Sequence, residues 1–262
     1  MNITHKTYHT LENRYLTGSR MKDFLKCKRY FYELHISGER IKKGKEAFVI
    51  GSAVDTWLTR GKDAFKSEYL AVSRRNIKNP PTDYTELTMA QYDDISVMCK
   101  VVEKQPAYLE LKDHTAQEII KCDMPIGDHF CGLSFIPDWY KIDGDTCIIT
   151  DLKTAQDASE MKYHWHCVSY GYYEQMAVAT LIFREINKDI KNFVYRHLII
   201  EKDPDGVPVP YTYFLDNERV EIAEKIITGE VMLAIAIEKD FKPKSVEWKG
   251  SPTIGKVDND WD

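Results

Sequence analysis

Two acidic residues and a lysine have a spacing suited to the hydrolysis of phosphate esters. Asp138 follows Pro137, Asp151 comes after twelve further residues, and Lys153 lies two positions beyond it. Carboxylate oxygens suit Mg²⁺ and Mn²⁺, which keep several waters and bind substrate phosphate. A lysine beside them supplies positive charge that can hold a water or stabilise a transition state. The pattern therefore predicts a site that cuts phosphodiester bonds.

The second half of this pattern lies on an apolar segment, residues 147–153, which reads as a strand. Side chains alternate between the two faces of a strand, so Asp151 and Lys153 share one face. Leu152 must then point the other way, into the core, while its backbone carbonyl stays free. A plain surface ion pair between Asp151 and Lys153 is the alternative interpretation.

Two further strands are expected to bring the other acids alongside. Residues 118–124 and 130–140 have extended patterns, and Asp143-Gly144 is a strong signal for a tight hairpin into 147–153. These three strands predict a meander that carries Glu118, Asp138, Asp151 and Lys153.

Helical patterns surround these strands. The expected helices cover residues 19–35, 47–59, 88–104, 167–187 and 217–239, and further strands cover 193–201 and 211–215. The predicted fold class is α/β, of the α+β mixed-sheet kind, with a central mixed sheet flanked by helices and a helical N-terminal region.

The composition suits a protein with a substantial core and no membrane association. Of 262 residues, 43% are hydrophobic and 29% charged, and the mean hydropathy is -0.45. No run approaches the roughly 18 apolar residues of a membrane helix. The first residues lack the apolar stretch of a secretory signal, and the six scattered cysteines form no C-x-x-C pair. We therefore expect reduced thiols and a cytoplasmic location, in a bacterial or phage-infected cell.

Charge is distributed unevenly. The net charge is -5, yet residues 20–45 contain nine Lys or Arg against three acids. A basic strip of this kind could attract a phosphate backbone to an otherwise acidic protein. A solvated helix face is an equally good interpretation of the charge count.

Four segments, in order, resemble motifs of the PD-(D/E)xK nuclease superfamily. They are closest to its RecB/RecE-like branch, the exonuclease VIII-like phage and prophage exonucleases. The matching segments are Lys28-Arg29-Tyr30, Ile50-Gly51-Ser52-Ala53-Val54-Asp55, the pair Gly132 to Asp138 with Ile149 to Thr154, and Tyr172-Tyr173-Glu174-Gln175. The central pair matches closely and the first segment weakly. The order, the spacing and the following helix make the resemblance more specific than a D-x-K sequence alone.

The resemblance implies a restriction-endonuclease-like core in one nuclease domain over residues 1–262. Its helical part would cover about 1–112, the catalytic core about 113–240, and a C-terminal tail 241–262. The implied catalytic residues are Asp138, Asp151, Lys153, Gln175 and Glu118. The implied metal ligands, for one or two Mg²⁺ or Mn²⁺ ions, are Asp55, Asp138, Asp151 and the carbonyl of Leu152.

Two positions depart from the family pattern. Asp55 stands where the family has a histidine ligand, and Ala179 stands where it has a tyrosine. Aspartate is also a good magnesium ligand, although Asp55 could instead lie in a first helical turn and stabilise the helix dipole. Glu118 and Gln175 could be plain surface residues. Tyr172 and Tyr173 are interpreted as packing residues.

The resemblance implies a metal-dependent exodeoxyribonuclease that degrades linear double-stranded DNA from its ends, 5′ to 3′, during recombination. It also implies a ring-like homo-oligomer and a single-strand annealing protein as partner. Two alternatives remain open: a non-catalytic DNA-binding or recombination accessory module on the same fold, and an endonuclease of repair or restriction type.

Overall fold

The computed structural model describes Tyr8 and residues 15–41, 46–72, 84–202 and 207–237. Its centre is a five-stranded sheet in the order β3, β6, β7, β8, β9. These strands are β3 (Thr115–Ala116), β6 (Trp139–Asp143), β7 (Thr146–Ala155), β8 (Asn192–Lys202) and β9 (Pro208–Phe214). β7 runs antiparallel to β6 and parallel to β8, so the sheet is mixed, as predicted.

The β6–β7 hairpin closes through the predicted tight turn. Asp143 pairs with Thr146, and Gly144 has a φ of 59°. Glycine adopts this left-handed conformation without the steric penalty of a Cβ. The turn sets the register of the hairpin, in which Trp139 at the start of β6 pairs with Thr150. Residues 151–155 of β7 therefore extend past β6, and this free edge bears the site described below.

The predicted three-stranded meander is wrong in one respect. Residues 130–140 form two strands, because the extended segment is interrupted before Asp138. β4 (Ile120–Ile126) pairs with β5 (His129–Phe135) in a separate two-stranded sheet, and only β6 joins the main sheet. Pro137 lies in the interruption, and proline has no N–H to donate to a neighbouring strand. The break turns the chain from one sheet to the other at the Pro-Asp motif.

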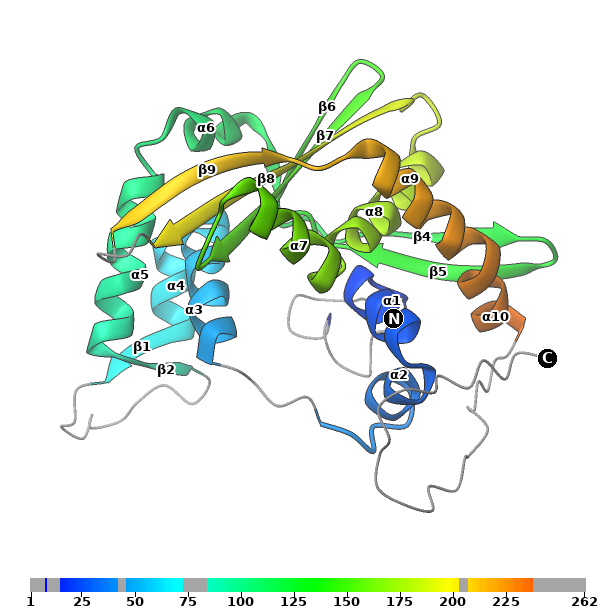
Figure 1. Cartoon of the computed structure of the whole chain (residues 1–262), viewed down its shortest axis with the longest axis horizontal. Coiled ribbons are helices and arrows are strands. Elements are labelled where there is room, and N and C mark those ends of the chain that lie inside the picture. Colours follow the sequence, from blue (N-terminus) through cyan, green and yellow to red (C-terminus); the bar gives the residue numbers. More distant parts are fainter. Residues whose placement is uncertain (1–7, 9–14, 42–45, 73–83, 203–206, 238–262) are drawn as a thin grey trace.

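Six helices from the N-terminal region and from the second half of the chain gather on one side of the main sheet. They are α1 (Gly18–Lys26), α2 (Lys28–His35), α7 (Glu160–Tyr170), α8 (Tyr172–Ile186), α9 (Asn217–Ile226) and α10 (Met232–Ile237), with a π-helical turn over Ile227–Val231. Ile149, Tyr195 and Ile199 of the sheet pack into the same core cluster as α8. Figure 1 shows these helices with β4 and β5 on one side of the molecule.

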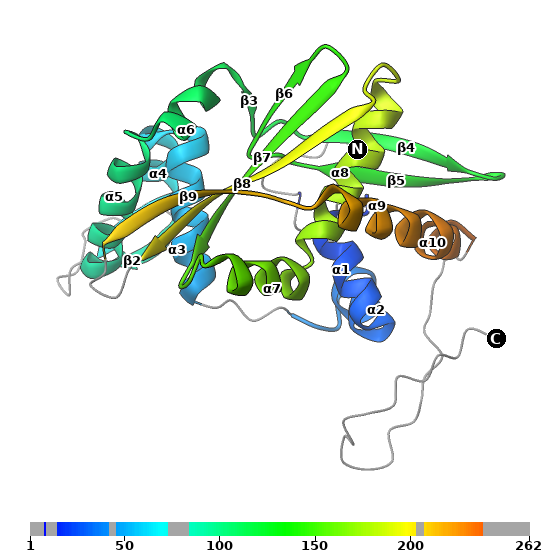
Figure 2. The same cartoon turned by 45° about the horizontal axis from the view of Figure 1, so that its top comes forward.

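The opposite face of the sheet carries a second core cluster. It includes Trp139, Leu152 and Leu198 from the sheet, packed with side chains of the helical part that precedes it. That part contains α3 (Glu46–Asp55), a π-helical turn (Thr56–Arg60), α4 (Lys62–Glu68), β1 (Tyr69–Val72), β2 (Thr85–Thr88), α5 (Met89–Val102), α6 (Pro106–Leu109) and a 3₁₀ turn (Glu110–Asp113). In Figures 1 and 2 it stands at the other end of the sheet from α1, α2 and α10.

Two of the predicted helices are each divided in two. Residues 19–35 form α1 and α2, which meet at the extended residue Cys27 (φ -164°). Residues 167–187 belong to α7 and α8, which meet at Gly171 with a φ of 67°. A left-handed glycine commonly ends a helix, and here it turns the chain so that α8 begins beside β7. Hydrophobic periodicity does not reveal such single-residue breaks.

The helix over 88–104 is confirmed as α5, with Thr88 and Gln91 forming a capping box. All six cysteines are free thiols. The tail over 241–262 lies outside the described residues. Among those residues, no helix combines the length and apolar character that crossing a bilayer requires.

Candidate active site

The two halves of the Pro-Asp and Asp-x-Lys pattern meet at the free edge of β7. The backbone N–H of Leu152 donates a hydrogen bond of 2.6 Å to Oδ2 of Asp138. This N–H is available because β6 begins only at Trp139, opposite Thr150, so no described strand pairs with β7 on this side beyond Thr150. The side chain of Leu152 is buried on the opposite face, as alternation predicts. Asp138 is thereby held against the backbone segment that carries the second acid.

Asp151 and Lys153 share one face of β7, as predicted, and form an ion pair between Oδ2 and Nζ. Their side chains are only 4% and 17% exposed, so this is not the surface pair of the alternative interpretation. Burial opposes the charged form of Lys153, but Asp151, Tyr172 and Asp138 together outweigh burial and raise the pKa of the lysine. Lys153 is therefore a firmly charged ammonium in this arrangement.

Gln175 reaches the same acid from α8. Its amide nitrogen donates to Oδ1 of Asp151 at 3.3 Å. The helix is placed close enough because α1 packs tightly against it: a Cβ on Gly18 would lie 2.8 Å from the Cα of Gln175. The structure thus brings Gln175 to the position that the sequence resemblance implies.

Asp55 approaches the acids from α3, on the other side of the sheet edge. It is the last residue of α3, so the alternative of a first-turn aspartate that stabilises its own helix is wrong. α3 lies close to β7, because a Cβ on Gly51 would be 3.4 Å from Oγ1 of Thr154. Asp55 interacts with the side chain of Asp138, and its Oδ1 lies 3.5 Å from the amide nitrogen of Gln117.

The acids disturb one another's protonation. Burial, and then the negative charge of Asp151, raise the pKa of Asp55 to about 6. Burial, followed by the charges of Asp55 and Asp151, raises the pKa of Asp138 well above its ordinary value. Strongly shifted carboxylates in one place are typical of functional sites. Three acids and one lysine lie in this cluster, and a bound cation would favour the ionised forms of the acids.

Comparison with known proteins agrees with this geometry. Residues 17–228 match the family described as "PDDEXK-like domain of unknown function (DUF3799)". The chain belongs to this family. Its membership places the protein in the PD-(D/E)xK superfamily and supports a nuclease, while leaving the RecB/RecE-like branch as a proposal. No curated protein matches the sequence.

The PDDEXK-like domain also has a structural neighbour. A crystal structure from Eubacterium rectale, named "Putative exonuclease", superposes with a TM-score of 0.64 and 16% sequence identity, over 88% of this chain and 84% of that chain. At this identity the likeness shows the fold alone. A second crystal structure, of SSO0001, has a TM-score of 0.28 and 14% identity over 54% of this chain and 60% of that chain.

An aromatic group lies behind the lysine of this PDDEXK-like site. The ammonium of Lys153 is 4.7 Å from the ring centroid of Tyr172, at the start of α8. His197 of β8 packs edge-on against Tyr172, and its Nδ1 shares a hydrogen bond of 2.8 Å with Tyr163. Burial and the nearby Lys153 lower the pKa of His197, which is therefore neutral. Tyr172 thus contacts the charge of Lys153 as well as packing, whereas Tyr173 is buried in the core as predicted.

Glu118 is not brought to the acids. It precedes β4, is exposed, and accepts a hydrogen bond of 2.5 Å from the hydroxyl of Tyr140. Its neighbour Gln117 faces the site instead and donates to Oδ1 of Asp138 at 3.0 Å. Only the family resemblance implies Glu118 at the site, and its exposed position favours the alternative of a plain surface residue.

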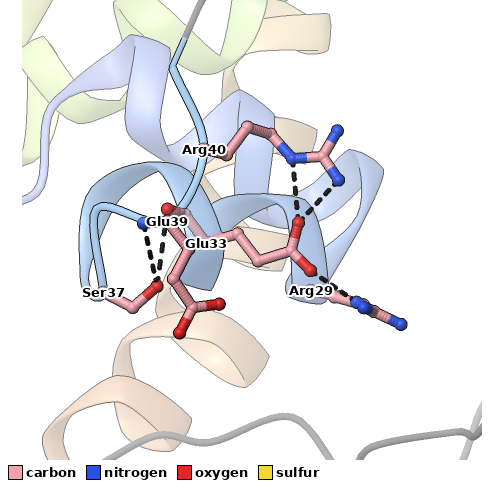
Figure 3. A network of polar contacts seen from close by, with 5 residues as sticks. All are labelled: Arg29, Glu33, Ser37, Glu39 and Arg40. Atoms are coloured by element: carbon pink, nitrogen blue, oxygen red, sulfur yellow. Dashed lines mark hydrogen bonds and ion pairs between the residues drawn. The ribbon is translucent and has the colours of Figure 1, made fainter.

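The described part of the basic strip is partly neutralised by its own acids. Figure 3 shows Glu33 accepting hydrogen bonds from Arg29 (2.6 Å) and from Arg40 (2.6 and 2.8 Å). This network ties the end of α2 to the segment that follows it. It favours the solvated-face interpretation for Arg29 and Arg40. Lys22 differs, because its side chain lies against Gly171 and Tyr170 at the turn that leads to Tyr172.

The donor chemistry of the pocket fits a hard divalent cation. Asp55, Asp138 and Asp151 offer carboxylate oxygens, and Leu152 offers a backbone carbonyl on the same edge of β7. Within the described residues, no three His, Cys, Asp or Glu side chains are already arranged as a ligand group. Lys153 and Gln117 contact the carboxylates instead. Metal binding would therefore require the acidic side chains to exchange these contacts for the ion.

Proposed function

We propose that this protein is a divalent-metal-dependent deoxyribonuclease, a 5′→3′ exonuclease that degrades linear double-stranded DNA from its ends. One observation carries the proposal: Asp138, Asp151 and Lys153 lie together in one largely buried cluster at the free edge of β7, with Asp55 beside them. Acids and a lysine in this arrangement suit phosphodiester hydrolysis better than any other chemistry open to these side chains.

The residues divide the chemical work. Asp55, Asp138, Asp151 and the carbonyl of Leu152 would hold one or two Mg²⁺ or Mn²⁺ ions. Such an ion, when bound, lowers the pKa of water and neutralises a phosphate. Lys153 keeps its proton, because Asp151 raises its pKa, so it orients the attacking water and stabilises the negative charge that develops on the phosphate. This favours an electrostatic role for the lysine over a role as base.

Gln175 and Tyr172 support these groups. Gln175 fixes the rotation of the Asp151 carboxylate through its amide hydrogen bond. Tyr172 presents its ring to the ammonium of Lys153 and so limits where the charge can lie. In the reaction, a water oxygen bonds to phosphorus as the bond to the 3′ oxygen breaks. The water loses a proton, and the departing oxygen gains one to become a hydroxyl.

The biological setting is part of the same proposal. The resemblance to phage and prophage exonucleases favours a role in DNA recombination, with a ring-like homo-oligomer around DNA ends and a single-strand annealing protein as partner. An oligomer that encloses DNA would need little basic surface, in agreement with the net charge of -5. The proposed location is the cytoplasm.

The test is digestion of DNA of defined form. Linear duplexes labelled at the 5′ or the 3′ end, and covalently closed circles, are incubated with Mg²⁺, with Mn²⁺ and with EDTA. We expect linear duplexes to be degraded only with a divalent ion, the 5′ label to be released first, and circles to persist.

Other results would select another function. Cleavage of closed circles would indicate an endonuclease of repair or restriction type. DNA binding without hydrolysis under either ion would indicate a non-catalytic module, the alternative suggested by Asp55 and Ala179. Ala179 lies on α8 and is completely buried in the core.

A further inference from the structure

Gln117 has an unusual backbone. Its φ is 52°, and among the described residues it is the only residue other than glycine with a positive φ. A side chain in this region costs free energy, and such conformations collect at functional sites. Gln117 lies in the irregular segment between β3 and β4, directly beside the acids.

Its backbone is attached to the Pro-Asp motif. The N–H of Gln117 donates to the carbonyl oxygens of Pro137, at 3.1 Å, and of Asp138, at 3.3 Å. The neighbouring residue Ala116 pairs with Trp139 in the main sheet. These contacts hold the unusual conformation and fix the start of the side chain relative to Asp138.

Its side chain reaches two acids at once. The amide nitrogen donates to Oδ1 of Asp138 at 3.0 Å and lies 3.5 Å from Oδ1 of Asp55. A glutamine amide has two N–H donors and no charge. It can therefore hold two carboxylates together without competing as a cation. If the amide were rotated by half a turn, its oxygen would face the two carboxylate oxygens and repel them. The nitrogen is therefore the atom that faces the acids.

Oδ1 and Oδ2 of Asp138 thus have different partners. Oδ2 accepts from the backbone of Leu152, and Oδ1 accepts from Gln117. A carboxylate held at both oxygens has a fixed plane, and its remaining lone pairs point in fixed directions. Hydrogen bonds of this kind orient metal ligands and tune their affinity.

We propose that Gln117 is a positioning residue that holds the carboxylates of Asp55 and Asp138 in the arrangement needed to bind a divalent ion. This deepens the proposed function and rests on it. A purely structural role in the turn after β3 is the competing explanation. The two explanations predict different effects of a glycine at this position. Glycine is the residue best suited to a positive φ, so it would satisfy the turn while removing the side-chain amide.

Gln117→Gly separates them. It removes the amide and relieves the backbone at the same time. If Gln117 serves only the turn, the variant should be as stable as the wild type and bind metal equally well. If Gln117 positions the acids, stability should be kept or increased while metal affinity falls by roughly 10- to 100-fold. Gln117→Asn, which tolerates the same backbone but is one methylene shorter, should also bind more weakly.

The experiment measures Mn²⁺ binding to purified wild type and variants, by the loss of the free-ion signal in electron paramagnetic resonance, together with thermal unfolding. Gln105→Gly is the matched control, because Gln105 is the N-cap of α6, where glycine is tolerated, and its side chain donates to the carbonyl of Val101 rather than to an acid. We expect Gln105→Gly to bind Mn²⁺ as the wild type does and both Gln117 variants to bind less.

Wild-type affinity in either folded Gln117 variant would overturn the proposal, as would failure of both variants to fold, since that result would show that the side chain is needed for folding itself. Failure of the proposed function has a separate signature. In that case the wild type itself neither binds Mn²⁺ nor cuts DNA, and no comparison among variants is involved.

Discussion

The backbone N–H of Leu152 and the carboxylate of Asp138 are joined by a hydrogen bond of 2.6 Å that connects the two halves of the Pro-Asp and Asp-x-Lys pattern. A short hydrogen bond from an N–H to a carboxylate is among the stronger neutral-to-charged contacts in proteins. It can form because β6 begins at Trp139 and leaves the edge of β7 free beyond Thr150. The break at Pro137 thus leaves this edge of β7 unpaired and places Asp138 beside it.

The contact between α1 and α8 should control the position of Gln175. Gly18→Ala would place a Cβ 2.8 Å from the Cα of Gln175, a backbone atom that no rotamer change can move away. We expect a loss of about 1 to 3 kcal/mol in the free energy of unfolding and a several-fold loss of nuclease activity. Chemical denaturation and a digestion assay at a temperature where the variant is folded measure the two effects.

Gly229→Ala is the matched control for this variant. Gly229 lies in the π-helical turn after α9, and a Cβ there would meet no atom within 4 Å. Its stability and activity should stay close to those of the wild type. Equal behaviour of the two alanine variants would show that α1 does not position Gln175.

Asp55 should make the metal-free protein less stable as the pH rises. Its pKa of about 6 in the folded protein lies above the ordinary value of 3.8. The folded state therefore holds a proton that the unfolded chain has lost, and this contribution is full below about pH 4 and disappears as the pH passes 6. In EDTA, the free energy of unfolding of Asp55→Asn should rise relative to that of the wild type as the pH rises, by about 2 to 3 kcal/mol at pH 7.5.

Thermal unfolding of both proteins between pH 4.5 and pH 8 measures this difference. Asp143→Asn, an exposed change in the β6–β7 turn that retains a good turn residue, should show no such trend. Added Mg²⁺ should stabilise the wild type more than Asp55→Asn. A constant stability difference across the pH range would contradict the raised pKa of Asp55.

Tyr172 should contribute to nuclease activity through the contact of its ring with Lys153. Because the ammonium of Lys153 lies 4.7 Å from the ring centroid, Tyr172→Leu removes an attraction of about 1 kcal/mol and should lower kcat roughly fivefold. Tyr172→Phe keeps the ring and should retain most of the activity. Steady-state digestion of linear duplex distinguishes the two, and equal loss in both variants would assign the effect to the hydroxyl instead.

The sequence predicts this site well where regular alternation applies. Asp151, Leu152 and Lys153 lie on one continuous strand, so their faces follow from the spacing alone. Asp138 could be placed near them because the Asp143-Gly144 turn sets the register of β6 against β7. These are local rules, and they remain valid in the folded protein.

The sequence fails where the backbone is irregular. The positive φ of Gln117 shifts the side chains by one residue, so the amide rather than Glu118 faces the site. The division at Gly171, which starts α8 beside Lys153, interrupts a continuous helical pattern. The proximity of Asp55 depends on packing between segments far apart in the chain, and only the family resemblance indicated it.

The most direct test of the central claim compares Asp138→Asn with Asp143→Asn and the wild type on linear duplex DNA in Mg²⁺. Both changes convert aspartate to asparagine, and only one touches the pocket. We predict that the wild type and Asp143→Asn degrade the DNA, while Asp138→Asn is folded yet at least about 100-fold slower. Degradation at the wild-type rate by Asp138→Asn would contradict the account.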